Sequence, residues 1–161
     1  RTDDHLWQVV AEAKAGYVCM HMQGTPATMQ VNPHYSDVVR EVGEFFADRL
    51  GRLARCGVDR EQVALDVGIG FGKGLDHNLD LLAGLESYRG FDRPLVLGVS
   101  RKSFLGRLLG VDVGERLPGA IACTTWAARA GVQVFRTHDV AATRHALRLM
   151  ETLLERAAKG R

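Results

Sequence analysis

The chain has 161 residues, 46% hydrophobic and 25% charged, with a formal net charge of +2. This composition is typical of an ordinary soluble globular domain, and the charge is too balanced to favour a nucleic-acid partner. The three cysteines are odd in number and form no C-x-x-C pair, so they suggest neither a disulfide framework nor a zinc ribbon. No apolar run reaches the roughly 18 residues of a membrane span, and no signal peptide is evident. We therefore expect a cytoplasmic protein.

Short β-rich runs alternate with stretches of helical period. In chain order the sequence predicts a helix at Asp3–Ala15, a strand at Tyr17–Met22, a helix at Asp37–Cys56, a strand at Val63–Val67, a helix at His77–Tyr88, a strand at Leu95–Val99, helices at Ser103–Leu109 and Glu115–Ala130, a strand at Val132–Arg136 and a helix at Asp139–Ala158. Ser36 is the expected N-cap of the second helix. The last helix is expected to bury Val140, Leu147, Met150 and Leu154.

Strands that alternate with helices indicate right-handed βαβ units and a parallel sheet. We expect the four strands to form one contiguous arc in sequence order, with the helices outside. No low-complexity linker interrupts the chain, so residues 1–161 are interpreted as one domain.

Polar side chains follow the ends of all four predicted strands. They comprise one carboxylate (Asp66), three cations (Arg101, Lys102 and Arg136) and histidines such as His21 and His138. Ligands bind at the carboxyl ends of strands both in open α/β sheets and in (β/α)8 barrels. Each residue also has a structural interpretation: the histidines as core or capping residues, the basic pair as solvated loop charges and Asp139 as an N-cap. Together they favour a site for a ligand that has an anionic group and a hydrogen-bond-donating heterocycle.

The run "LDVGIGFGKG" at 65–74 places glycines at every second position beside a lysine. It is neither a Walker loop, which would need glycine at Val67, nor a dinucleotide fingerprint, because Lys73 and Leu75 stand where the last glycine is required. The glycines could serve only a tight turn.

Four motifs identify a family. "MHMQGTPATMQ", "LDVGIGFGKGLDHNLDLL", "LVLGVSRKSFLG" and "VFRTHDVAATRHAL" resemble dihydropteroate synthase, in that family's order. The resemblance implies a (β/α)8 TIM barrel, of which about four βα units, the carboxyl-terminal half, are present. It also implies condensation of 6-hydroxymethyl-7,8-dihydropterin pyrophosphate with 4-aminobenzoate in folate biosynthesis, inhibition by sulfonamides, a homodimer built through the last three helices, and Mg²⁺ held by residues of the other half.

The resemblance also implies a role for individual residues. Asp66 would hydrogen-bond the pterin, and Met20, Phe71, Gly98 and Lys102 would surround its ring. Ser100 and Arg101 would bind 4-aminobenzoate, and Arg136 with His138 would bind the leaving diphosphate. No general acid or base is assigned.

Two alternatives remain open. One is another pterin-binding barrel, such as a methyltetrahydrofolate methyltransferase, which carries no diphosphate site. The other is a non-catalytic half-barrel, because a complete barrel typically needs about 250 residues. The family usually has proline where Val67 stands, and we expect this departure to loosen the turn without removing the carboxylate.

Overall fold

A computed structural model of the chain describes residues 4–159; Asp3, the expected start of the first helix, lies outside this range. The helices are α1 (Asp4–Glu12), α2 (Val38–Arg55), α3 (Leu75–Ala83), α4 (Ser103–Leu109), α5 (Leu117–Arg129) and α6 (Val140–Lys159). Short 3-10 helices are η1 (Arg60–Gln62), η2 (Leu85–Phe91) and η3 (Val113–Glu115). The strands are β1 (Tyr17–Met20), β2 (Val63–Asp66), β3 (Leu95–Leu97) and β4 (Val134–Phe135).

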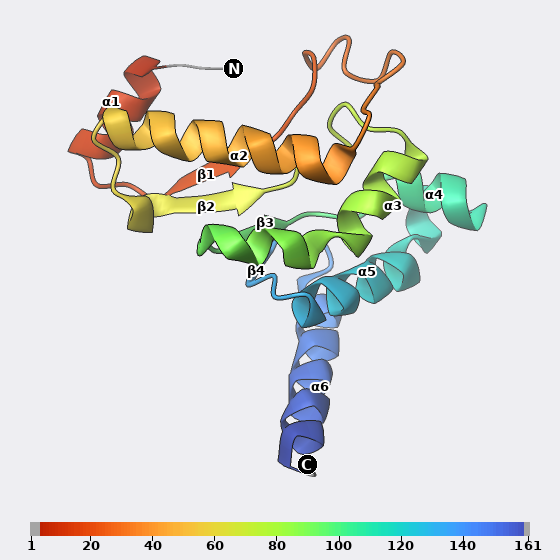
Figure 1. Ribbon diagram of the computed structural model, residues 1–161. Coiled ribbons are helices and arrows are strands. Elements are labelled where there is room, and N and C mark those ends of the chain that lie inside the picture. The colour runs from red at the N-terminus through yellow and green to blue at the C-terminus, as the bar shows by residue number, and fades with distance from the viewer. Residues whose placement is uncertain (1–3, 160–161) are drawn as a thin grey trace.

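The four strands form one sheet in the order β1-β2-β3-β4, and every neighbouring pair is parallel (Figure 1). Met20 lies beside Asp66 in the β1–β2 register, and Leu97 lies beside Phe135 in the β3–β4 register. The predicted contiguous parallel arc is therefore confirmed. Its carboxyl ends share one edge, so the polar residues that follow the strands are brought to the same side of the molecule.

The core lies between the sheet and the helices that cover it, of which α2 runs along one face (Figure 1). Val42, Phe46 and Leu53 project from α2 into a cluster with Leu65 of β2, and all four are at most 1% exposed. The apolar stripe predicted for this helix accounts for their burial, since its members recur on one helical face. Burying each such side chain contributes about 1.5–3 kcal/mol, which fixes the sheet that carries the site.

Several predicted boundaries are wrong. The expected helix His77–Tyr88 begins earlier, at Leu75, and is interrupted at Gly84, beyond which the chain continues as η2. Asp37 caps α2 instead of Ser36: its extended backbone lets the side chain accept a hydrogen bond from the Arg40 N–H. The strands are also shorter than predicted, because apolar residues such as Val67 and Val99 are buried beyond the last strand pairing.

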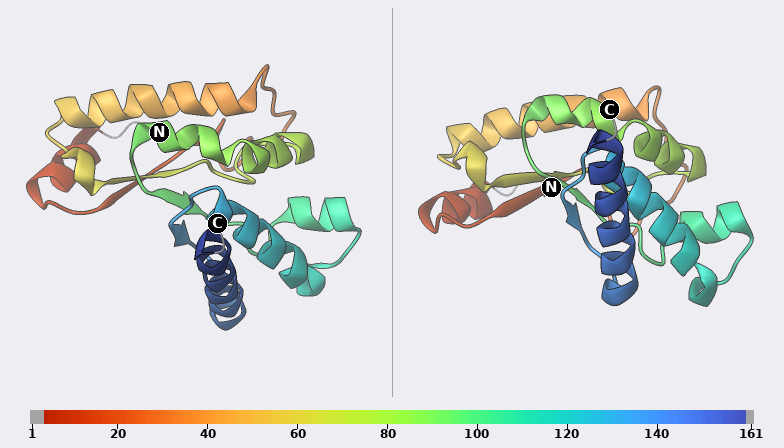
Figure 2. Two further views of the ribbon diagram at one scale, coloured as in Figure 1. Left: turned by 60° about the horizontal axis from the view of Figure 1, so that its bottom comes forward. Right: turned by 90° about the horizontal axis from the view of Figure 1, so that it is seen from below.

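The last helix does not bury the face that its sequence predicts. Val140 is 64% exposed and Leu154 is 45% exposed, while Leu147 and Met150 are half-buried. Figure 2 shows the reason: α6 projects away from the rest of the structure, so only its first turns pack against other elements. The outer strands have exposed valines as well, Val18 in β1 and Val134 in β4. No helix within the described range is long and apolar enough to cross a membrane.

Candidate ligand site at the carboxyl edge of the sheet

Asp66, the last residue of β2, is the centre of the polar edge. Its side chain is only 4% exposed, and its Oδ1 accepts a hydrogen bond of 2.8 Å from the backbone N–H of Gly68. Arg136, which directly follows β4, reaches across the edge and places Nη2 3.7 Å from Asp66 Oδ2. Asp66 and Arg136 follow different strands, β2 and β4, and converge on one rim of the sheet.

Gly98 lies between them, just beyond β3. A Cβ atom at this position would lie 3.2 Å from Arg136 Nε and 3.3 Å from Nη2. A larger side chain would therefore displace the guanidinium. The absence of a side chain at Gly98 lets Arg136 cross the end of β3 towards the buried carboxylate.

Two polar pairs join the ends of β3 and β4. Ser100 Oγ accepts from the backbone N–H of His138 and lies 2.9 Å from His138 Nδ1. Arg101 donates from Nη2 to Asp139 Oδ1 at 3.1 Å, so the Asp139 carboxylate is engaged in an ion pair. Arg101 has a φ of +59°, which is uncommon for a residue with a side chain and is a feature that accumulates at functional sites.

The glycine-rich loop 68–72 packs directly against the segment that follows β1. Gly68, Gly70 and Gly72 all have positive φ, at +68°, +80° and +67°. A Cβ atom on Gly68 would overlap the carbonyl oxygen of His21, and one on Gly72 would overlap that of Gln23. The glycines therefore permit a close backbone approach in addition to the turn.

Side chains hold this loop through its carbonyl groups. Four consecutive carbonyl oxygens, those of residues 69–72, each accept one side-chain hydrogen bond. In order, Ile69 accepts from Lys102 Nζ, Gly70 from Gln30 Nε2, Phe71 from Lys73 Nζ and Gly72 from the Tyr35 hydroxyl. The donors come from the loops after β1, β2 and β3, so the loop position depends on three strands at once.

Phe71 and Lys102 lie together at this edge. Lys102 Nζ is 4.8 Å from the centroid of the Phe71 ring, within the range of a cation–π contact. Burial lowers the pKa of Lys102 to about 8; the Asp66 charge acts in the opposite direction, and the Arg136 charge reinforces the lowering. The edge thus presents a flat aromatic ring beside a carboxylate and two cations.

Lys73 lies in the glycine-rich run but has no role predicted from the sequence, and the structure places it behind this edge. It is 2% exposed, and its Nζ lies 2.9 Å from His21 Nδ1. Burial lowers the pKa of Lys73 to about 7. The negative charge of Asp66 acts to raise this pKa, and the positive charge of Lys102 lowers it further. Burial, and then the charge of Lys73, lower the pKa of His21 to about 3, so the imidazole is neutral and accepts the hydrogen bond. The sequence feature that could have pointed to Lys73 is its position as the lysine of the glycine-rich run.

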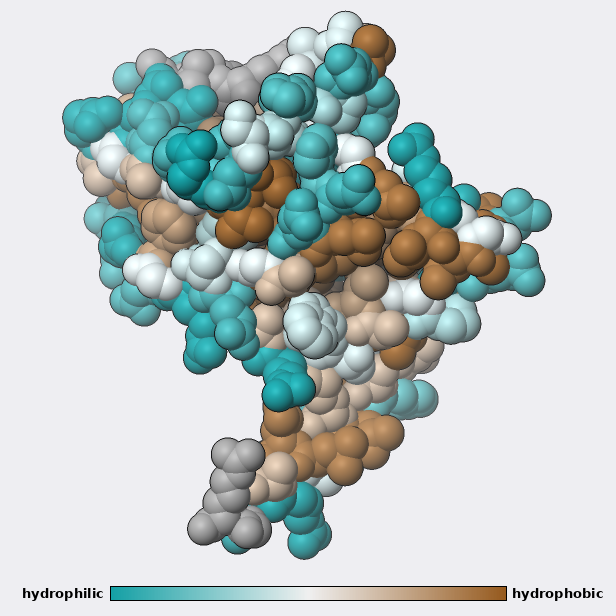
Figure 3. All heavy atoms as spheres, turned by 45° about the vertical axis from the view of Figure 1, so that its right-hand side comes forward, coloured by the Kyte–Doolittle hydropathy of each residue, from teal (hydrophilic) through white to brown (hydrophobic). Residues whose placement is uncertain are grey.

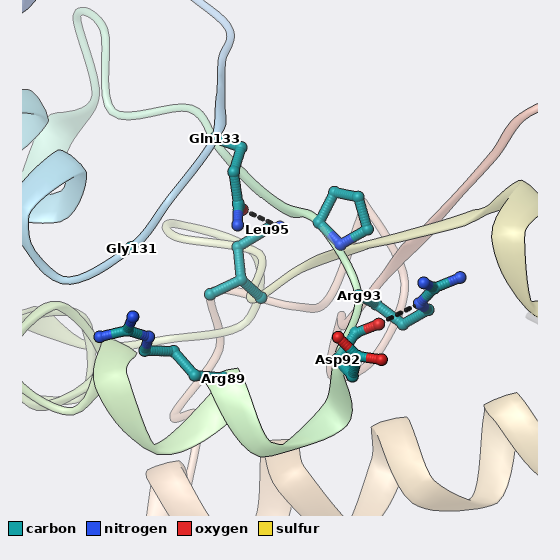
Figure 4. Close-up of a pocket in the computed structure, with 7 residues that line it drawn as sticks. Arg89, Asp92, Arg93, Leu95, Gly131 and Gln133 are labelled. Atoms are coloured by element: carbon teal, nitrogen blue, oxygen red, sulfur yellow. Dashed lines mark hydrogen bonds between the residues drawn. The ribbon is translucent and has the colours of Figure 1, made fainter.

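A cavity of about 440 Å³ lies at the opposite edge, where β3 and β4 begin (Figure 4). Arg89, Arg93 and Gln133 are among its lining residues. Gln133 Oε1 accepts from the backbone N–H of Leu95, and Arg93 donates to the backbone carbonyls of Asp92 and Arg60. These groups hold the strand beginnings together, and they lie away from the edge that gathers Asp66, Lys102 and Arg136.

The described residues do not form a metal site by themselves. Within residues 4–159, no three histidine, cysteine or acidic side chains lie close enough together to hold a metal ion.

A parallel sheet of βα units with polar groups gathered at its carboxyl edge is characteristic of α/β enzymes, (β/α)8 barrels among them. The chain belongs to the family described as pterin binding enzymes, which matches residues 1–138.

Relatives within that family are dihydropteroate synthases. The chain is 44% identical over 147 residues to the dihydropteroate synthase of Escherichia coli K12, covering 91% of this chain and 52% of that protein. A crystal structure of the Yersinia pestis enzyme with a sulfonamide drug complex has 38% identity and a TM-score of 0.90, over 92% of this chain and 54% of that one. The Thermus thermophilus enzyme in complex with 4-aminobenzoate has 40% identity and a TM-score of 0.88, over 94% and 62%. The chain thus spans about half the length of its curated relatives.

Proposed function

We propose that residues 1–161 form one half-barrel domain of a dihydropteroate synthase, which condenses 6-hydroxymethyl-7,8-dihydropterin pyrophosphate with 4-aminobenzoate and releases pyrophosphate. The main support is the pairing of Asp66 with Arg136 at 3.7 Å. It places a group that would bind the pterin next to a group that would bind the diphosphate. The same rim would thereby hold both ends of the bond that breaks.

Asp66 is the proposed pterin anchor. A buried carboxylate is costly unless it is paired, and the ring N–H groups of a pterin would supply charge-assisted hydrogen bonds to it. Phe71 and Lys102 offer a flat surface with a cation above it, which suits a planar heterocycle. Met20 at the end of β1 and Gly98 beyond β3 complete the proposed wall.

Ser100 and Arg101 are the proposed contacts of 4-aminobenzoate, since a hydroxyl and a guanidinium suit a carboxylate-bearing ring. Arg136 and His138 are the proposed diphosphate contacts. The Arg136 side chain is 63% exposed, which leaves its guanidinium accessible to an anion while it faces Asp66. Ser100 holds His138 in place through the bond to its ring nitrogen.

The chemistry is displacement at the methylene carbon attached to the pterin. Arg136 and His138 would stabilise the charge that develops on the diphosphate as the carbon–oxygen bond breaks. The pterin would share the positive charge on the methylene, and the Asp66 anion would favour that cation. The amine of 4-aminobenzoate is already nucleophilic, so it needs positioning more than activation. No general base is required of these residues. Mg²⁺ would be held by residues of the other half of the barrel, since no group of three histidine, cysteine or acidic side chains within residues 4–159 could hold it.

We further propose a cytoplasmic homodimer. The cysteines Cys19, Cys56 and Cys123 are all free thiols, which is consistent with a reducing compartment. The proposed dimer surface lies on the last three helices, α4, α5 and α6. Leu108, Leu109 and Trp126 on the first two, and Leu149 and Leu153 on α6, are about half exposed or more. Figure 3 shows hydrophobic surface on the side of the molecule that carries these helices.

Calorimetric titration of the full-length protein tests the proposed roles. Asp66→Asn should weaken binding of 6-hydroxymethyl-7,8-dihydropterin by roughly ten- to a hundredfold, because one charge-assisted hydrogen bond is lost. Arg136→Ala should weaken pyrophosphate binding and leave the affinity for the phosphate-free pterin nearly unchanged. Arg40→Ala is the matched control, because that arginine is exposed on α2 and paired with Glu44.

Equal loss of both ligands in Arg136→Ala, or no loss in Asp66→Asn, would show that the roles are wrongly assigned. A chain of only these 161 residues should form no dihydropteroate. Turnover by that chain would contradict the proposal that a half-barrel is insufficient.

A further inference from the structure

Lys73 differs from the other three donors that hold the glycine-rich loop. Gln30 binds from an exposed position, Tyr35 is neutral and Lys102 is only partly buried, whereas Lys73 is 2% exposed. Its ammonium joins two segments: Nζ lies 2.9 Å from His21 Nδ1, in the segment after β1, and donates to the Phe71 carbonyl at 3.1 Å. It also lies 5.9 Å from the centroid of the Tyr35 ring.

Burying a lysine at this position costs free energy. Desolvation disfavours its charged form, and an apolar side chain of similar volume often replaces a buried ionic group without loss of stability. Packing alone therefore does not explain the residue. The groups that face Lys73 are the neutral His21, the Tyr35 ring, Asp66 and Lys102, so Asp66 is the anion that favours its charge.

Lys73 Nζ contacts two atoms, His21 Nδ1 and the Phe71 carbonyl oxygen, and both belong to segments that form the proposed pterin site. The Phe71 carbonyl belongs to the residue whose ring lies under Lys102. His21 directly follows Met20, and its backbone N–H donates to the Asp66 carbonyl at 3.0 Å. A shift of Lys73 would thus change the position of the Phe71 ring relative to the Asp66 carboxylate.

We propose that Lys73 is a positioning residue of the pterin site: by linking His21 to the Phe71 carbonyl, its Nζ sets the distance between the Phe71 ring and Asp66 and so determines affinity for the pterin. This role rests on the proposed function. Because Lys73 is buried and contacts His21 and the Phe71 carbonyl, it would act through these residues and not by touching the substrate.

The test compares Lys73→Met with Lys14→Met in the full-length protein. Lys14 is an exposed lysine paired with Asp59 and remote from the carboxyl edge, so it controls for loss of a lysine. Lys73→Met should bind 6-hydroxymethyl-7,8-dihydropterin about tenfold more weakly, the effect of one lost hydrogen bond to a charged group. Its affinity for 4-aminobenzoate and its Tm should stay close to those of the wild type, because methionine fills the space and removes the buried charge.

Nitrogen NMR of His21 reports on the contact itself without any ligand. In the wild type, Nδ1 should be the unprotonated nitrogen and the ring should resist protonation, since its pKa is lowered to about 3. In Lys73→Met one of the two causes of that lowering is removed, so the ring should accept a proton at a higher pH.

Unchanged pterin affinity in Lys73→Met would overturn the proposal. So would parallel losses of pterin affinity, 4-aminobenzoate affinity and Tm, which would indicate a purely structural role. If the wild type bound no pterin, the proposed function would fail and the positioning role with it, while the His21 spectrum would still report whether Lys73 contacts the ring.

Discussion

Gly68 and Gly110 have nearly the same backbone conformation in different surroundings. Their φ angles are +68° and +69°, but a Cβ on Gly68 would overlap the His21 carbonyl, whereas nothing lies within 4 Å of one on Gly110. Alanine at Gly110 should therefore cost only the strain of the left-handed conformation, about 1–2 kcal/mol. Alanine at Gly68 should cost more, because the segment after β1 must also move.

Urea unfolding of the two alanine variants measures this difference. We expect the free energy of unfolding to fall further in Gly68→Ala than in Gly110→Ala. Equal losses would mean that the close approach of the glycine-rich loop to His21 contributes nothing to stability.

Some residues of the site could be predicted from the sequence, and others could not. Asp66, Lys102 and Arg136 could be proposed because each follows an apolar strand, and parallel strands bring such positions to one edge. The partners of these residues could not be proposed, because a contact such as that of Ser100 with His138 joins residues 38 apart in the chain. Lys73 was missed for the same reason, since its burial depends on segments after both β1 and β2.

Helix α2 shows how an element can be predicted while its start is not. Its apolar stripe specifies the helix, but Ser36 and Asp37 are both acceptable caps by residue type. The structure selects Asp37, whose Oδ1 accepts from the Arg40 N–H at 2.9 Å. Ser36 instead contributes its backbone N–H to Glu41.

Replacing each candidate cap by alanine tests this assignment. Asp37→Ala should lower the free energy of unfolding by about 1 kcal/mol, the usual value of an N-cap. Ser36→Ala keeps the backbone contact with Glu41 and should change it by less than about 0.5 kcal/mol. Thermal unfolding of both variants would contradict the assignment if Ser36→Ala were the more destabilised.

At the scale of the whole molecule, the later helices expose apolar surface in two neighbouring regions. One is on α4, η3 and α5, and the other follows α6, where Leu149 and Leu153 are 63% and 60% exposed. Figure 3 shows hydrophobic surface along the projecting helix as well. Exposed apolar patches of this kind mark interaction surfaces.

If the protein dimerises through the region on α4, η3 and α5, a substitution that disrupts this region should lower its molecular mass in solution. Light scattering of the full-length protein at high micromolar concentration should give twice the protomer mass. Leu108→Glu should shift it to the monomer, because a charge would be buried in the interface. Val31→Glu is the control, since Val31 is 76% exposed in the loop between β1 and α2. A monomeric wild type, or dissociation by both substitutions, would count against this interface.

The sequence by itself determined the alternation of strands and helices, the parallel sheet, the edge at which polar residues gather and the family. These follow from local periodicity and from residues adjacent to strand ends, which are properties of short segments. The tertiary structure alone decided which polar groups pair, why three glycines need positive φ, that Lys73 is buried beside His21, and which face of α6 is covered. Those outcomes depend on contacts between distant segments, and a side chain's burial or charge state is set by neighbours that its own stretch of sequence does not contain.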